Sequence, residues 1–321
     1  VRLNYTCLHE RFTSYERPPQ EVFDLLGDIT SADLYHYATT DNLGNTLDCL
    51  NIIEPAPGFY YGVHHYYNGT SFNVHLVNST NLIQWTFIQL LSHESSMPVI
   101  EYVAETGEIY LAHEQWQNQN TGSPCWIKIR YYPSLAHLVA ADDTKFYQTP
   151  ETLSKLEGTP NFYAIEKDGN EIHLGLHFNG ENGLDRVANG VLSDFHSSSP
   201  KWTTEIVNEY NEKLICRGNK GDIGGRETRI INNVKYSVQE VRAVKDDWTS
   251  WNSYLYNWAD GGFWELPITT HDGSVSFSNP HFRFVHNPND LTKWVMFGTF
   301  FVLGEGAAPG EAGSLVFYKA I

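Results

Sequence analysis

The chain has 321 residues, of which 41% are hydrophobic and 18% are charged, so it can build one large core or two ordinary ones. Its formal net charge is −17 at pH 7, which repels phosphate backbones and argues against nucleic acid as a partner. No apolar run approaches the ~18 residues that indicate a membrane span, so we expect no membrane partner.

Two features of the sequence predict a secreted glycoprotein. Three N-glycosylation sequons begin at Asn4, Asn68 and Asn78. The four cysteines are even in number and widely spaced, which fits two disulfides in any of three connectivities better than a zinc or redox motif. They are Cys7, Cys49, Cys125 and Cys216.

The predicted elements, in chain order, are a short strand and then a series of β-hairpins. The short strand lies near residue 32, in ADLYHYA. Each hairpin has two alternating strands joined by a turn of Gly, Asn, Asp or Pro. The hairpins span 50–66, 98–114, 160–177, 226–242 and 280–300. A third strand can follow each of them, near residues 71, 125, 186, 251 and 313, and outer strands near 84 and 201 complete some units.

The hairpins form five similar units of roughly fifty to sixty-five residues, a period typical of propeller blades. No helical stretch of useful length interrupts them. The sequence therefore predicts an all-β fold, a single five-bladed β-propeller domain over residues 1–321 with a central funnel. A two-sheet sandwich is the main rival. The strand near residue 32 is expected to help close the ring by pairing with the last blade.

Two stretches resemble the five-bladed propeller glycosidases of glycoside hydrolase family 43. GFYYGVHHYYNGTSFNVHLVNSTNLIQWTFIQLL, residues 58–91, looks like that family's first blade and its Ser-x-Asp-Leu-x-x-Trp turn. LEGTPNFYAIEKDG, residues 156–169, looks like the third-blade Glu-Gly-Pro motif that carries the general acid. The resemblance implies a glycoside hydrolase that acts in the funnel, with Glu157 as the acid.

The other two acid positions of that family are altered in this chain. The first blade has Asp48-Cys49 where the family has Asp-Pro with the base, and in the second blade Val99 follows Pro98 where the family has an acid. The nearest carboxylate there is Glu101. Inverting hydrolysis requires one protonated and one ionised carboxyl on opposite sides of the scissile bond. The expected catalytic residues are therefore Glu157, Asp48 and Glu101.

Each of these acids also has a plain structural interpretation. Glu157 can be a turn carboxylate bound to nearby backbone N–H groups. Asp48 can be a surface acid, and Glu101 can be a strand residue that faces solvent.

Other residues near the hairpin starts are expected to contact a ligand. Arg226 follows a glycine-rich loop and, with Arg229, can bind a carboxylate or polar oxygen in a bidentate manner. His281 begins the fifth hairpin, and His65 and Trp116 lie in blades one and two. The structural alternatives are an ion pair for Arg226, a hydrogen-bonded core position for His281 and packing between blades for Trp116.

No cofactor is expected, although a single ion in the channel stays open. His64, His65 and His75 crowd blade one, but strand alternation keeps His64 and His65 from facing the same side. No set of His, Asp and Glu has a spacing that indicates a metal site.

The altered acids leave three further functions open. A uronate-directed polysaccharide lyase needs an arginine and a His or Tyr base. A pericyclase of secondary metabolism, such as a hetero-Diels–Alderase, needs an aromatic funnel with a few hydrogen-bond donors. A lectin needs similar pockets between several blades. The expected ligand is in each case a small molecule or an oligosaccharide.

Overall fold

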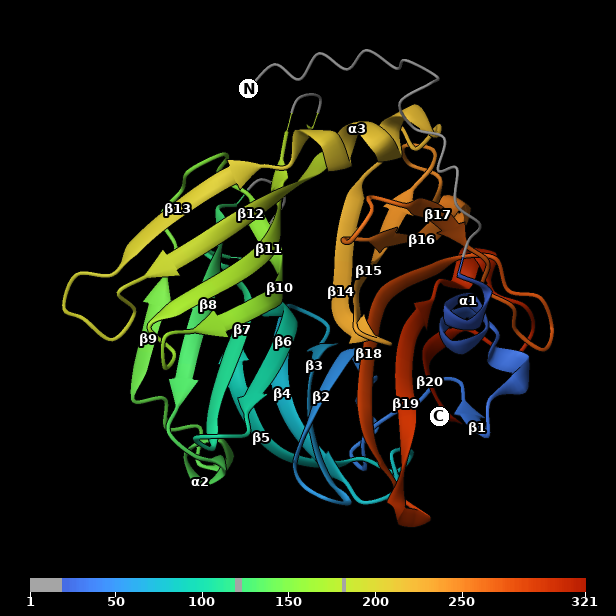
Figure 1. Ribbon diagram of the computed structural model, residues 1–321, viewed down its shortest axis with the longest axis horizontal. Coiled ribbons are helices and arrows are strands. Elements are labelled where there is room, and N and C mark those ends of the chain that lie inside the picture. The colour runs from blue at the N-terminus through green and yellow to red at the C-terminus, as the bar shows by residue number, and fades with distance from the viewer. Residues whose placement is uncertain (1–18, 119–122, 181–182) are drawn as a thin grey trace.

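The computed structural model describes residues 19–118, 123–180 and 183–321 as five four-stranded antiparallel sheets arranged as a β-propeller (Figure 1). This confirms the predicted fold class. Blade one contains β2 (Asp48–Ala56), β3 (Phe59–Tyr67), β4 (Phe72–Ser79) and β5 (Thr86–His93). Blade two contains β6 (Ser95–Val103), β7 (Glu108–Trp116), β8 (Cys125–Tyr132) and β9 (Lys145–Gln148). Blade three contains β10 (Glu157–Glu166), β11 (Glu171–Asn179), β12 (Asp185–Ser193) and β13 (Lys201–Ile206).

The last two blades complete the ring. Blade four contains β14 (Ile223–Ile231), β15 (Val234–Arg242), β16 (Trp251–Asn257) and β17 (Phe263–Leu266). Blade five contains β18 (Phe277–Asn287), β19 (Asp290–Val302) and β20 (Gly313–Ala320), and its outer strand is β1 (Leu34–His36). β1 pairs antiparallel with β20, with Leu34 opposite Tyr318, so the predicted closure by the early strand is confirmed.

Short helices and two outer strands were not predicted. The helices are α1 (Gln20–Gly27), α2 (Leu135–Val139) and α3 (Asn208–Cys216), together with the 3₁₀ turns Ile29–Ser31, Trp248–Ser250 and Gly304–Gly306. The missed strands, β9 and β17, have four residues each, too few for alternation to be recognised. Within the described residues no helix has the length and apolar character needed to cross a bilayer.

Apolar side chains hold neighbouring blades together. Val22, Phe23 and Leu26 on α1 pack with Phe282 and Phe300 of blade five in a buried cluster that also reaches blade four. The rings of Phe282 and Phe300 meet edge to face with their centroids 5.6 Å apart, and such a pair adds roughly 0.5–1.5 kcal/mol beyond its buried area. The short helix therefore fills a space beside the closing blade, next to the pairing of β1 with β20.

A β-bulge near the start of the first strand recurs in every blade. The pairing register shifts between Asp48 and Asn51, Ser96 and Val99, Gly158 and Asn161, Ile223 and Arg226, and Ser278 and His281. In four blades the bulge contains a non-glycine residue with positive φ: Cys49 (57°), Met97 (49°), Thr159 (47°) and Asn279 (53°). Such backbone is costly outside glycine, about 1–3 kcal/mol per residue. A bulge changes the direction in which the neighbouring side chains point, so the five bulges determine which side chains face the end of the channel.

The expectation of two disulfides is wrong. Cys49 and Cys125 are both free and buried. Cys49 Sγ lies 3.3 Å from the Met97 sulfur instead of another cysteine. Cys7 and the sequon at Asn4 lie outside the described residues. Asn68 is exposed and Asn78 is half-buried, and glycosylation at either one stays a prediction.

Candidate functional site

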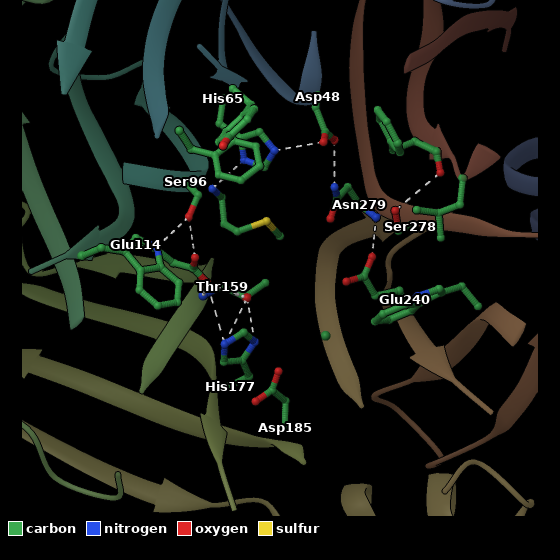
Figure 2. A pocket seen from close by; sticks show the side chains of 18 of the residues that line it. Asp48, His65, Ser96, Glu114, Thr159, His177, Asp185, Glu240, Ser278 and Asn279 are labelled. Carbon is green, nitrogen blue, oxygen red and sulfur yellow. Dashed lines mark hydrogen bonds and ion pairs between the residues drawn. The ribbon is translucent and has the colours of Figure 1, made fainter. Parts of the chain in front are cut away.

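A cavity of about 710 Å³ opens where the first strands begin (Figure 2). The bulges of blades one, two, three and five contribute Asp48, Met97, Thr159 and Asn279 to its wall, and blade four contributes Gly224. Residues far apart in the sequence meet here because every first strand begins at the same end of the channel. The cavity is therefore the candidate site.

Asp48 is held as an ionised carboxylate at this end of β2. His65 Nε2 lies 2.9 Å from one carboxylate oxygen, and Asn279 Nδ2 donates to the other at 2.8 Å. Met97 N–H donates to His65 Nδ1 at 3.0 Å, so the ring proton must sit on Nε2 and point at Asp48. Burial raises the pKa of Asp48, but His65 and Asn279 more than offset this, and the net pKa lies below its usual range.

The ends of the second strands supply further polar groups to the cavity. In blades one to three, the residues paired with the first-strand starts are His65, Glu114 and His177, which face Asp48, Ser96 and Gly158. Directly paired residues share one face of a sheet. The hairpin register pairs all six positions, but of the second-strand residues only His65 was predicted, and Glu114 and His177 were missed.

Glu114 fills the place where the third blade has no side chain. Ser96 Oγ donates to one of its oxygens at 2.6 Å, and Thr159 N–H donates to the other at 2.8 Å. His177 Nε2 lies 3.7 Å from the same carboxylate. A Cβ on Gly158 would meet Glu114 Oε1 at 2.3 Å, so the Glu114 carboxylate of blade two occupies the space that a side chain at position 158 of blade three would need.

Glu240, on β15, is a buried acid with a strongly perturbed pKa. Gly225 N–H donates to one oxygen at 2.6 Å, and Asn279 N–H donates to the other. Burial raises the pKa of Glu240 to about 7, although these two backbone donors favour its charged form and oppose the shift; the nearby charge of Asp48 adds to it. Asn279 thus contacts both acids, through its side chain to Asp48 and through its backbone to Glu240.

Asp185 lies across the cavity from Asp48 (Figure 2). It begins β12, is half-buried, and accepts a hydrogen bond from Asn179 Nδ2 at 3.1 Å on one oxygen. Burial raises its pKa, and the neighbouring charge of Asp222 adds to the effect against the opposing effect of His177. Asp48 and Asp185 therefore have pKa values shifted in opposite directions, an arrangement typical of an acid–base pair.

The remaining wall of the cavity is largely aromatic and apolar. Trp116 lines it, as predicted, and its indole N–H donates to Ser96 Oγ at 3.0 Å. The other apolar lining residues are Tyr67, Phe72, Met97, Leu156, Trp248, Trp251, Phe301 and Leu303. Of the described residues that line the cavity, none is Lys or Arg.

Glu157 does not reach the cavity. Its carboxylate is buried and accepts hydrogen bonds from the backbone N–H groups of Thr152 (2.7 Å), Leu153 (2.6 Å) and Ser154 (3.1 Å). The turn-carboxylate interpretation therefore describes its position, and the expectation of a general acid here is corrected. The bulge explains the error, because it brings Thr159, and not Glu157, to the cavity wall.

Arg226 lies between blades three and four, away from the cavity. Its guanidinium donates to the carbonyls of Leu176 (3.0 Å) and Ala188 (3.2 Å) and covers the ring of Tyr163. It is buried, so the predicted ligand contact is corrected to a contact between blades.

The other predicted residues meet further along the first strands, outside the cavity wall. Arg283 binds Glu101 with both terminal nitrogens at 3.0 Å, and Arg229 lies 2.6 Å from the buried Glu227. His281 Nδ1 lies 2.8 Å from Glu227 as well. We call these five side chains the channel ion cluster. Glu101, Arg229 and His281 were expected in the ligand site, and the structure places them in this cluster instead.

The cavity acids do not form a good metal site. Asp48, Cys49 and His65 each offer a ligand atom within 4.8 Å of the others. Both nitrogens of His65 are engaged, however, one as an acceptor from Met97 and the other as a donor to Asp48. Burial and the charge of Asp48 also raise the pKa of the Cys49 thiol, which disfavours the thiolate that metals bind.

The fold is similar to that of solved carbohydrate-active proteins. A thermostable family-43 glycoside hydrolase superposes with a TM-score of 0.53 at 10% identity, covering 89% of this chain and 92% of that one. An exo-1,5-alpha-L-arabinanase from a bovine ruminal metagenomic library gives 0.55 at 11%, covering 88% and 95%. An N-acetylgalactosamine deacetylase from F. plautii, solved with blood group B trisaccharide, gives 0.53 at 12%, covering 92% and 93%. The sequence matches no protein-family model and no curated protein.

Proposed function

We propose that the chain is a carbohydrate-active enzyme that hydrolyses a glycosidic bond in this cavity with inversion. The observation that carries the proposal is the pair of carboxyls on opposite sides of the cavity, Asp48 with a lowered pKa and Asp185 with a raised one. The similarity of the fold to glycoside hydrolases supports it.

The two acids divide the chemistry between them. Protonated Asp185 donates its proton to the glycosidic oxygen as the bond to the anomeric carbon breaks. Ionised Asp48 takes a proton from the water that attacks the opposite face of that carbon. Inverting enzymes hold such carboxyls ~6.5–9.5 Å apart so that the water fits between them.

The neighbours of Asp48 preserve this division. His65 directs its Nε2 proton at Asp48 and cannot accept another proton without losing the bond from Met97. Glu240 shares Asn279 with Asp48 and, with its pKa raised to about 7 by burial, is mostly neutral in mildly acidic solution. A neutral Glu240 places no second charge beside the base.

The test compares three variants on a panel of aryl glycosides and plant oligosaccharides. Asp48→Asn and Asp185→Asn should each lower kcat/KM by about 10²–10⁴-fold, the usual contribution of a general acid or base. Glu157→Gln should keep the wild-type value, since its carboxylate is bound inside a turn. NMR of the first-formed anomer should show inverted configuration. Loss of activity in Glu157→Gln but not Asp185→Asn would reverse the assignment.

A second candidate is a pericyclase that orients an apolar substrate, and the aromatic wall favours it. Trp116, Trp248 and Trp251 offer flat surfaces, and the acids opposite them already have partners within the protein. A uronate-directed lyase is less favoured, because the described lining residues include no arginine to neutralise a carboxylate.

The two candidates differ in their ligands. For a pericyclase, apolar polycyclic compounds should quench the cavity tryptophans and protect the protein against heat, whereas sugars should do neither. Absence of turnover across the glycoside panel together with tight binding of such compounds would favour the pericyclase. Turnover of any glycoside that depends on Asp185 excludes it as the main function.

A further inference from the structure

A second group of titratable side chains lies on the side of blade one that faces away from the cavity. His64 precedes His65 on β3, and alternation sends its ring to the opposite face of the sheet. His75, on β4, is its direct cross-strand partner. Asp41 comes from the loop before β2, which is tied to the blade by a bridge to Trp85. One ligand atom from each of Asp41, His64 and His75 lies within 4.8 Å of the other two.

The hydrogen bonds of His64 fix which of its nitrogens carries a lone pair. Its Nδ1 lies 3.2 Å from the carbonyl oxygen of His65, which can only accept, so Nδ1 carries the proton. Nε2 is therefore the basic nitrogen, and it is buried without a hydrogen-bond partner. Histidines that bind metals usually have this arrangement, with the second nitrogen donating to a backbone carbonyl or a carboxylate.

The two other side chains complete a set of three ligands. His75 is 9% exposed, and its Nδ1 is also buried and without a partner. The Asp41 carboxylate is buried, and Leu43 N–H, Asn45 N–H and the Asn45 side chain fix its orientation at 2.8, 2.9 and 2.7 Å. Two unpartnered imidazole nitrogens beside an oriented carboxylate leave buried polar atoms that a bound cation would satisfy.

Blade two provides an internal comparison. His113 occupies the position equivalent to His64, and its Nδ1 lies 2.9 Å from the carbonyl of Glu114. Its cross-strand partner is Lys128, whereas His64 has His75. In both blades the histidine Nδ1 thus contacts the backbone carbonyl of the following residue. Of blades one and two, only blade one adds a second imidazole and a carboxylate.

We propose that Asp41, His64 and His75 bind a divalent transition-metal ion of the zinc class. Two imidazoles and one carboxylate are a common ligand set for Zn²⁺, and water can take the fourth position. Zn–N and Zn–O bonds of ~2.0–2.2 Å require ligand atoms ~3.3–3.6 Å apart, which small side-chain rotations provide. Phe87 and Tyr66, whose rings lie 5.0 and 5.7 Å from that of His75, form an apolar surrounding. The ion would fasten the loop at Asp41 to blade one.

The experiment titrates the chelator-treated full chain with ZnCl₂ and CoCl₂. We expect one equivalent of metal per chain by elemental analysis, visible absorption bands of four- or five-coordinate Co²⁺, and a higher Tm with Zn²⁺. Removing a residue that only orients a metal ligand typically lowers metal affinity ~10–100-fold. His75→Gln removes a ligand itself, so it should lower the affinity for Zn²⁺ by more than this. His113→Gln is the matched control and should bind like wild type. Circular dichroism establishes that each variant is folded.

Two further variants keep the proposal falsifiable. If His75→Gln does not fold, Asp41→Asn must weaken binding instead. His65→Gln tests the alternative cluster at the cavity and should leave the Co²⁺ spectrum unchanged. The proposal is overturned if wild type binds no metal, if His65→Gln abolishes binding, or if His113→Gln and His75→Gln lose it equally.

Discussion

The cavity and the channel ion cluster differ in how their carboxylates are paired. At the cavity end, Asp48 and Asp185 stand apart, with no lysine or arginine among the described lining residues. Further along the first strands, ~10–17 Å from the cavity-lining residues at ~3.3 Å per residue, Glu101 and Glu227 are bound directly by Arg229 and Arg283. Both regions are rich in buried polar groups, yet only at the cavity end is a carboxyl pKa raised while another is lowered.

The contrast shows how a structural cluster differs from a candidate catalytic one. In the channel ion cluster, burial alone would raise the pKa of Glu227, but Arg229 and His281 reverse the shift and hold this carboxyl ionised. The ion pairs of this cluster join side chains of blades two, four and five. In the cavity, burial raises the pKa of both Glu240 and Asp185, and the pKa of Glu240 reaches about 7, so the protonation of Glu240 can change under mild conditions.

Removing one partner of the channel ion cluster should give the largest loss of stability. Glu227→Gln removes the nearer carboxylate of the buried Arg229, at 2.6 Å, and leaves only Glu101 at 3.5 Å; breaking a buried pair typically costs about 3–5 kcal/mol. Urea unfolding should show this loss while ligand binding in the cavity is retained. The exposed Glu205→Gln, on β13, serves as a control and should change the free energy of unfolding by less than about 0.5 kcal/mol. An equally small change in the free energy of unfolding for Glu227→Gln would show that the channel ion cluster does not stabilise the fold.

The cavity end should instead show a pH-dependent contribution to stability. Glu240 has a folded-state pKa of about 7 against an ordinary value of 4.5, so the folded state binds the proton more tightly. Its contribution is full below pH 4.5 and is lost as the pH rises to 7, a change of about 3 kcal/mol. Glu240→Gln should flatten the free energy of unfolding across this window. An unchanged slope in the variant would show that Glu240 does not titrate there.

The hairpin pattern was sufficient to predict the fold but only part of the site. Alternation and turn residues identify strands locally, so the five blades and the closing strand followed from them. Asp48, His65 and Trp116, which were expected in the site, line the cavity, and their roles stay a prediction. Glu114, His177, Asp185 and Glu240 lie on second and third strands and were missed, because only the pairing register shows which residues of these strands face the cavity.

The bulges account for the remaining misplacements. Strand alternation predicts which face a residue occupies only while the register is regular. One extra residue in β10 brings Thr159 to the cavity wall, although Thr159 is β-branched and has a φ of 47°, while the carboxylate of Glu157 binds the turn that precedes the strand. Nothing in the local sequence announces this, since threonine rarely adopts positive φ.

Glu157→Gln should show whether Glu157 stabilises the turn or acts in the cavity. It removes the charge that the N–H groups of residues 152–154 bind, and hydrogen bonds to charged groups contribute about 1.5–3 kcal/mol. We expect a loss of about 2 kcal/mol in the free energy of unfolding, measured by urea denaturation, with an unchanged KM for any cavity substrate. A changed KM with unchanged stability would return Glu157 to the site.

The smallest expected effect concerns the aromatic wall. Trp116→Phe keeps a flat ring but removes the indole N–H that orients Ser96, a hydrogen bond worth about 1 kcal/mol. Affinity for a cavity ligand should fall roughly fivefold by calorimetry. Trp264→Phe, on the outer strand β17, is the control and should bind normally. If both variants bind equally well, Trp116 does not contribute to recognition.

The pairing of β1 with β20 has a consequence for biosynthesis. The sheet of blade five joins residues 34–36 to residues 313–320, so almost the whole chain lies between two neighbouring strands. A ribosome-bound chain that lacks its last strand exposes the edge of β1 and the open side of β19, both of which can pair with other chains. Blades one to four can fold as they emerge, but the ring cannot close until β20 has left the ribosome, and until then the nascent propeller depends on protection of these two edges.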